Sequence, residues 1–338
     1  MAGRDYAASR GEYLNSKVLA KYLGFDFIDA GKYIFFDDQG NFDWTKTEAK
    51  LAPKLAKTNK AVIPGFYGSM PNGTIKTFSR GGSDVTGSIV ARATKAKLYE
   101  NWTDVSGCLI CDPRIVNNPE PIKTITYREL RELAYMGATV LHEDAIFPVR
   151  AAGIPVNIKN TNQPEDRGTM IVSESAEHCD HIITGIAGKK GMSVINIEKD
   201  KMNSEIGFGK NVLRALEKSN VSFEHMPSGV DTMSVVIATE ALAGKETAII
   251  DEIKSRVHPD QIYIESNLAL IAVVGRGMKS ARGTAAILFS ALADARVNIK
   301  MIDQGSSELN IIVGVRNCYF KQAIKAIYDE FITSEDDE

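Results

Sequence analysis

Residues 77–91 read TFSRGGSDVTGSIVA. A short β-type run precedes the turn at Gly81–Gly82, and small residues that suit a helix follow the turn. Ser83 or Asp84 can cap this helix, because their side-chain oxygens accept hydrogen bonds from its first free N–H groups. A helix start beside a Gly-Gly turn favours an anion, and Arg80 can hold a carboxylate or phosphate with two hydrogen bonds. The stretch therefore predicts a site for a small zwitterionic or phosphorylated ligand.

Two interpretations of this stretch remain open on the residues alone. In the first, Arg80 meets an anionic group of the ligand, while Asp84 meets an ammonium group or a metal. In the second, the stretch is an ordinary turn with a capped helix and a solvated arginine, since short glycine-rich patterns recur by chance.

Composition sets broad limits on the class of protein. The 338 residues are enough for two or three domains, and 44% hydrophobic with 25% charged residues is ordinary for a globular protein. A net charge of −3 gives no general attraction to nucleic acid or to an anionic membrane. The sequence lacks a membrane-spanning apolar run, and its N-terminus lacks the apolar core of a signal peptide, so the cytoplasm is the expected location.

The cysteines offer little chemistry. Cys108 and Cys111 form a lone CxxC without a second pair or other ligands close in sequence. We interpret both as small buried hydrophobes rather than as a metal or redox site.

The first half of the chain alternates between predicted strands and helices. Glu12 is placed in the first turn of the first helix, Asn72–Gly73 indicates a hairpin, and Thr126 and Glu129 have capping-box spacing. The alternation predicts an α/β domain with a mainly parallel sheet. Helices are predicted at 9–23, 44–57, 82–95, 126–137 and 142–152, and strands at 61–66, 97–103 and 154–159.

A second candidate site follows the strand that ends near Thr103 and Asp104. The chain then makes a glycine-containing excursion to Arg114. Ligands of open α/β sheets bind beyond the carboxyl ends of the strands, so these three residues are candidate nucleotide contacts. Ordinary turn chemistry is the alternative.

An internal repeat fills the second half of the chain. A shift of 76 positions superposes residues 192–239 on 268–315 without a gap. Each copy predicts a ferredoxin-like βαββαβ unit. Residues 182–186 also have strand character, so an early strand is predicted to be exchanged between the copies. The paired helices are predicted at 207–219 and 283–295, and at 245–256 and 319–331.

Several motifs, in one order, carry a resemblance to a known family. FSRGGSD, WTDVSG with DPRIV, YRELRELAYMGATVLHEDAI and IPVNIKNT resemble the aspartate kinases of the amino-acid kinase family, and the repeat resembles their paired ACT domains, which sense amino acids. The resemblance implies a kinase domain at 1–172 and ACT domains at 180–265 and 266–332.

The resemblance also implies an activity and residue roles. The family transfers the γ-phosphoryl group of ATP, with Mg²⁺, to the side-chain carboxylate of L-aspartate, which begins lysine, threonine and methionine synthesis. Arg80 would bind an aspartate carboxylate, and Asp84 and Glu12 of SRGE would orient the substrate. The implied substrate loop is completed by Gly81, Gly82 and Ser83, and the implied nucleotide contacts are Thr103, Asp104, Arg114, Thr139 and Val140.

The first repeat supplies the candidate effector site. If it folds as predicted, loops 201–207 and 225–231 converge and carry groups able to hold both ends of an amino acid. By resemblance, lysine is the first choice, threonine and methionine are alternatives, and ACT domains pair the chain into a dimer; solvated turns are the opposing interpretation. The candidate effector residues are Met202, Ser204, Glu224, Ser228 and Asp231.

The chain departs from the family pattern in three places. Leu109 replaces a usual tyrosine, Thr139 replaces a usual lysine, and Glu143 replaces a proline. A KFGGS loop, whose lysine contacts the transferred group, is not found, and roughly the first hundred residues of a typical domain are expected to be missing. We therefore expect little acyl phosphate from residues 1–338 alone. A non-catalytic regulatory subunit is the main alternative, and another amino-acid kinase is a weaker one.

Overall fold

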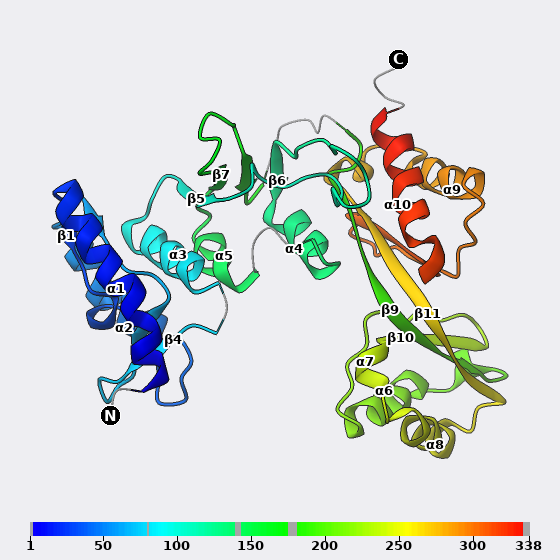
Figure 1. Ribbon diagram of the computed structural model, residues 1–338. Helices are drawn as coiled ribbons and strands as arrows, with labels where there is room; N and C mark the ends of the chain where they lie inside the picture. Colours follow the sequence, from blue (N-terminus) through cyan, green and yellow to red (C-terminus); the bar gives the residue numbers. More distant parts are fainter. Residues whose placement is uncertain (1–2, 80, 139–142, 175–180, 334–338) are drawn as a thin grey trace. The chain divides into compact units, whose positions relative to one another are not determined.

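The computed structural model describes residues 3–79, 81–138, 143–174 and 181–333 (Figure 1). They form two compact units. The first holds the described residues of Met1–Leu109, Pro121–Ala134 and Thr139–Glu177, and the second holds those of Ile110–Glu120, Tyr135–Ala138 and His178–Glu338. In the described part of the chain, no helix has the length and apolar character needed to cross a membrane.

The first unit begins with helix α1 (Arg4–Leu23), which starts earlier than predicted. Asp5 lies in its first turn, so the prediction that placed Glu12 there is wrong. The Thr77 N–H donates to Asp5 Oδ2 at 3.2 Å, which holds this first turn against strand β4 (Ile75–Thr77). The prediction rests on apolar residues at three- and four-residue spacing, and this spacing begins only at Leu14.

The predicted hairpin precedes the glycine-rich turn. Strands β3 (Tyr67–Ser69) and β4 pair antiparallel. Asn72 Oδ1 accepts from the Thr74 N–H at 3.0 Å, and Gly73 has a φ of 80°, which favours glycine. The hairpin is confirmed, and it delivers the chain to helix α3 (Gly82–Thr94).

Two short strands and helix α2 (Trp44–Leu55) pack near α3 in the first unit. Strand β1 (Asp26–Phe27) pairs parallel with β2 (Ala61–Val62), and α2 lies between them in sequence. Helix α3 packs through apolar residues at four-residue spacing, Val85, Ile89 and Ala93. Their partners in the buried cluster include Ile28, Ile34, Leu51, Tyr67 and Ala145.

A four-stranded sheet forms the rest of the unit, in the order β5-β7-β8-β6. The pairs β5 (Tyr99–Thr103) with β7 (Val156–Asn160), and β6 (Thr124–Thr126) with β8 (Thr169–Val172), are parallel. Strands β7 and β8 pair antiparallel. A Cβ on Gly168, before β8, would lie 1.9 Å from Ile158 O, so this junction needs glycine. The parallel pairs of the predicted α/β fold are present.

Helix α4 (Tyr127–Tyr135) starts with the predicted capping box. The Thr126 N–H and Oγ1 both donate to Glu129 Oε2, at 2.8 and 2.7 Å, and the Glu129 N–H donates to Thr126 Oγ1 at 3.2 Å. Glu129 is fully buried. The prediction is confirmed at the level of individual atoms. Helix α5 (Glu143–Ala151) follows.

The second unit is built on one antiparallel sheet in the order β10-β9-β11-β13-β12. Figure 1 shows β9 (Gly185–Glu198) and β11 (Gln261–Val274) as long paired strands, with α6 and α8 near one end and α9 and α10 near the other. The remaining strands are β10 (Thr232–Ala238), β12 (Met301–Asp303) and β13 (Asn310–Arg316). The helices are α6 (Phe208–Lys218), α7 (Thr239–Leu242), α8 (Glu246–Val257), α9 (Thr284–Asp294) and α10 (Phe320–Tyr328), followed by a π-helical turn Asp329–Thr333.

The structure reproduces the sequence repeat. A shift of 76 carries both ends of α6 onto those of α9. The two copies share long strands: residues 185–190 of β9 pair with the second copy, while residues 192–198 pair with β10 in the first copy. The predicted exchange of an early strand is therefore present, and it joins both ferredoxin-like copies into one sheet. An irregularity between Glu265 and Leu268 marks the change of partner.

Candidate active site

The turn that begins α3 depends on close backbone packing. A Cβ on Gly82 would lie 2.7 Å from the Phe66 ring, and a Cβ on Gly65 would lie 2.9 Å from Ser83 Cα. The Phe66 N–H lies 3.2 Å from Gly82 O and 3.1 Å from Thr86 Oγ1, both of which accept from it. Two glycines thus allow segments 65–66 and 82–83 to pack together.

The predicted side-chain cap of α3 is wrong. Gly81, at φ 55° and ψ 29°, is the N-cap, and no side chain caps the helix. Because the helix starts at Gly82, Ser83 and Asp84 lie inside its first turn. Ser83 is exposed and Asp84 is half-buried. Asp84 Oδ1 instead accepts a hydrogen bond from Asn101 Nδ2 of β5 at 2.9 Å.

Of the other two predicted substrate residues, the structure describes Glu12 but not Arg80. Arg80 lies outside the described residues. Glu12 is half-buried, two turns along α1 from Asp5. The bond from the Thr77 N–H to Asp5 ties this helix to the strand that leads into Gly81–Gly82. The structure therefore links the element that carries Glu12 to the glycine-rich turn.

An aromatic cluster that the sequence did not indicate surrounds the arginine of SRGE. The Arg10 guanidinium carbon lies 4.3 Å from the Tyr6 ring centroid, 4.4 Å from that of Tyr13 and 5.5 Å from that of Tyr67. Tyr67 donates to Asp29 Oδ1 at 2.7 Å. Burial and the Asp29 carboxylate raise the pKa of Tyr67 above its ordinary value, so it stays a donor at neutral pH. The cluster fixes α1 beside β3.

The predicted nucleotide residues lie at the carboxyl end of β5. Thr103 Oγ1 donates to Asp104 Oδ1 at 3.2 Å. Thr161, after β7, donates to Thr103 O through its N–H at 2.8 Å and its Oγ1 at 2.9 Å. Ser106 donates to Asp166 Oδ2 at 2.5 Å. Thr161 and Ser106 stabilise the ends of two parallel strands, a role that only the strand pairing could reveal.

Arg114 belongs to the second unit, whereas Thr103 and Asp104 belong to the first. Its side chain is 83% exposed and forms an ion pair of 2.8 Å with Asp112. Hydrogen bonds from Arg114 lower the pKa of Asp112, so the pair stays ionised at neutral pH. Of the remaining nucleotide candidates, Thr139 and Val140 lie outside the described residues.

The two thiols of the CxxC pair are buried and weakly acidic. Burial raises the pKa of Cys108 to about 12 and that of Cys111 to about 12, so both thiols are protonated at neutral pH. Within the described part of the chain, no group of three or more His, Cys, Asp or Glu side chains is arranged to hold a metal ion. Both side chains are buried, as expected for small buried hydrophobes.

The predicted effector loops converge in the first repeat. The Asn203 N–H donates to Val230 O at 3.0 Å, and the Lys201 N–H donates to Asp231 Oδ1 at 2.8 Å. Ser204 Oγ donates to Lys201 O at 2.8 Å. Met202, at 4% exposed, packs in the core under α6 and α8.

Glu224 makes a separate polar cluster. Its Oε2 accepts from Lys189 Nζ at 2.6 Å and from the Tyr135 hydroxyl at 2.5 Å. Burial opposes its ionisation, but these two hydrogen bonds outweigh burial and hold the pKa of Glu224 below its ordinary value. Ser228 lies opposite Met233, at the start of β10.

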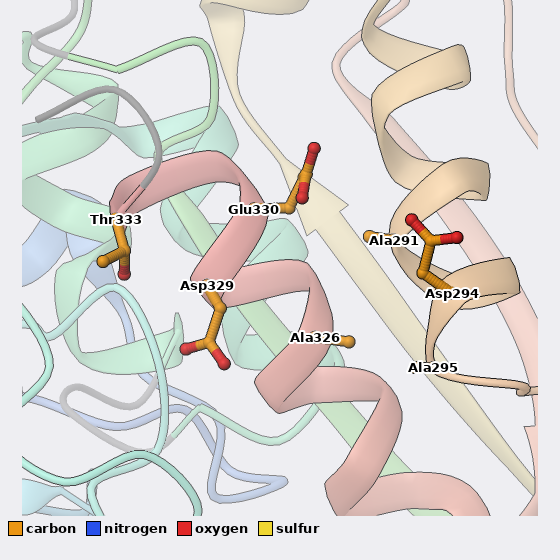
Figure 2. Close-up of a pocket in the computed structure, with 7 residues that line it drawn as sticks. All are labelled: Ala291, Asp294, Ala295, Ala326, Asp329, Glu330 and Thr333. Atoms are coloured by element: carbon orange, nitrogen blue, oxygen red, sulfur yellow. The ribbon is translucent and has the colours of Figure 1, made fainter. Parts of the chain in front are cut away.

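A cavity of about 440 Å³ lies in the second repeat, between α9 and the C-terminal helical turns (Figure 2). Its lining offers three carboxylates and one hydroxyl but no cation. The carboxylate of a free amino acid would be repelled by three neighbouring carboxylates and would meet a single neutral donor, so this cavity does not suit one. The lining residues are Ala291, Asp294, Ala295, Ala326, Asp329, Glu330 and Thr333.

Comparison with known proteins gives family matches for both halves of the chain. Residues 1–160 match the amino acid kinase family and residues 271–331 match an ACT domain. "Aspartokinase 3" of Bacillus subtilis is 40% identical over 97% of this chain and 74% of its own length.

Solved structures of aspartate kinases are also similar to this chain. The Clostridium acetobutylicum aspartate kinase has a TM-score of 0.91 and 59% identity, over 98% of this chain and 76% of its own. Escherichia coli aspartokinase III shares the fold at 24% identity. Its complex with aspartate and ADP has a TM-score of 0.72, over 96% of this chain and 75% of its own. Its complex with lysine and aspartate has a TM-score of 0.73, over 97% and 75%. The chain belongs to the aspartokinase family.

Proposed function

We propose that this protein phosphorylates the side-chain carboxylate of L-aspartate with ATP, giving 4-phospho-L-aspartate. The observation that carries the proposal is Asp84, a carboxylate in the first turn of α3 beside the Gly81–Gly82 turn, in a chain of the aspartokinase family. This turn combines helix N–H groups, which attract an anion, with a carboxylate, which attracts an ammonium group. L-Aspartate carries both kinds of charge.

The substrate roles follow from these charges. Arg80 holds a carboxylate of aspartate through a two-point hydrogen bond, while Asp84 and Glu12 orient the ammonium end. Ser83 is exposed at the same turn and adds a hydroxyl. Fixing the acceptor carboxylate matters because phosphoryl transfer depends on alignment and charge neutralisation.

The nucleotide roles rest on the end of β5. Thr103 and Asp104 lie at the carboxyl end of β5, the end of the strands at which open α/β sheets bind ligands, and Arg114, Thr139 and Val140 are the further candidates. ATP would supply the phosphoryl group at this site, and Mg²⁺ would neutralise the charge on the phosphates. Mg²⁺ usually takes only one or two protein carboxylates beside phosphates and water, so Asp104 suits it without a cluster of acids.

The repeat supports a regulatory role. We propose that the converging loops 201–207 and 225–231 bind an amino-acid effector, with lysine first because E. coli aspartokinase III was solved with lysine. Threonine and methionine are the other candidates, in keeping with a first step toward these three amino acids. We also propose domains at 1–172, 180–265 and 266–332, pairing through the ACT domains, and a cytoplasmic location.

Arg80→Ala tests the substrate site. In the complete gene product, the substitution should lower kcat/KM for aspartate by about 2–4 kcal/mol, because a charged donor to the substrate is lost. Arg92→Ala is the matched control. Arg92 lies in the last turn of the same helix and stacks 3.8 Å from the Trp44 ring centroid. Aspartate kinetics within twofold of the parent in Arg80→Ala would refute the assigned role.

A further inference from the structure

Asn101 holds the Asp84 carboxylate from the neighbouring strand β5. Asn101 is 8% exposed. Its Nδ2 donates to Asp84 Oδ1 at 2.9 Å and to the Tyr99 hydroxyl at 3.1 Å, so both amide hydrogens are used. The Tyr99 hydroxyl in turn donates to Asp84 O at 3.4 Å. The three residues form a closed ring of hydrogen bonds across two elements.

Helix α3 has a glycine where this ring needs space. A Cβ on Gly87 would lie 2.4 Å from the Tyr99 hydroxyl oxygen, so any larger residue would displace Tyr99. Burial raises the pKa of Tyr99, which keeps its hydroxyl protonated and able to donate. Gly87 thus leaves space for Tyr99 against α3, and Tyr99 and Asn101 together hold Asp84 from β5.

We propose that Asn101 is a positioning residue for the amino-acid substrate, acting through Asp84. The inference rests on the proposed substrate role of Asp84. An amide donor holds Oδ1 in place, and Oδ2 then receives the substrate ammonium group. Because the amide is neutral, Asp84 keeps its full negative charge, whereas a lysine or arginine at this position would neutralise it.

The substitution Asn101→Asp separates positioning from simple packing, because the shape is kept and the donor is lost. Two carboxylates that share a site raise the pKa of one of them. At about pH 8 both are ionised and repel, so aspartate affinity should fall roughly tenfold, the loss expected for one hydrogen bond to a charged group. At about pH 5.5 one shared proton restores both the hydrogen bond and the net charge of −1, and affinity should return toward the parent value.

Asn101→Leu gives the complementary result. It removes the donor without adding a charge, so aspartate affinity should fall roughly tenfold at both pH values, while the affinity for ATP stays unchanged. Thr47→Val is the matched control for loss of a buried hydrogen bond. Thr47 is fully buried, and its Oγ1 accepts from the Phe35 N–H at 2.9 Å. This control should lose stability but keep its aspartate affinity.

The measurement is calorimetric titration of L-aspartate into the parent protein and the three variants at both pH values. Recovery at low pH that is confined to Asn101→Asp supports the inference. Affinity within twofold of the parent in Asn101→Leu, or the same pH dependence in parent and Asn101→Asp, overturns it. If Asn101→Leu fails to fold, the two pH values of Asn101→Asp decide alone. Parent protein that binds ATP but not aspartate would overturn the proposed function, and this inference with it.

Discussion

At the scale of single residues, the candidate ligand-binding side chains differ in whether another charged side chain of the protein already pairs with them. Asp84 has a neutral partner, Asn101, whereas Arg114 is paired with Asp112 and Glu224 with Lys189. A residue with a neutral partner can meet a charged ligand without first breaking an ion pair. A ligand that uses Arg114 or Glu224 must compete with a partner that is already in place.

The pairing of Glu224 gives a prediction about pH. Its pKa is lowered in the folded protein, so its contribution to stability is present above the unfolded value of 4.5 and is lost as pH falls through the folded value. Glu224→Gln should therefore cost about 1.5–3 kcal/mol at neutral pH and much less in acid. Denaturant unfolding of parent and variant at several pH values measures this.

Glu217→Gln is the matched control, since Glu217 is exposed on α6 and should cost little at any pH. A cost for Glu224→Gln that does not change between neutral and acid pH would contradict the ion-pair explanation.

At the scale of elements, the starts of α3 and α4 show which hydrogen bonds can be predicted from neighbouring residues in the sequence. The box of Thr126 and Glu129 involves partners three residues apart, so spacing alone predicted its geometry. The start of α3 at Gly82 was predicted correctly, but its side-chain cap was not, because Asp84 bonds to Asn101, which lies 17 positions along the chain. The antiparallel pairing of β7 with β8 was missed for the same reason, since it depends on Gly168 lying against Ile158.

The capping box is itself testable. Thr126→Val removes a cap oxygen from the Glu129 N–H and a donor from the buried Glu129 carboxylate. The free energy of unfolding should fall by about 1–2 kcal/mol. Thr94→Val is the control, because the exposed Thr94 bonds only within its own helix, to Val90 O and Ala91 O, and should change stability by less than about 0.5 kcal/mol.

Equal stability of the two threonine variants in denaturant unfolding would show that the box contributes little. The parent sequence would then owe the start of α4 to packing of its apolar residues Leu130 and Leu133.

At the scale of the whole molecule, the repeat was the most predictable feature. A single shift of 76 fixed the ends of α6 and α9, because both copies keep the same apolar spacing. Strand sharing was only partly visible: residues 182–186 suggested an exchanged strand, but the union of both copies in one sheet depends on β9 and β11 each running through both. Such long-range pairing leaves little mark on local sequence.

The most direct test of the central claim is acyl phosphate formation by the complete gene product, trapped with hydroxylamine. The account predicts a product that requires both ATP and L-aspartate, and that decreases when lysine occupies the first repeat. No aspartate-dependent product, from protein that still binds lysine in a calorimetric titration, would contradict the account and favour a non-catalytic regulatory subunit.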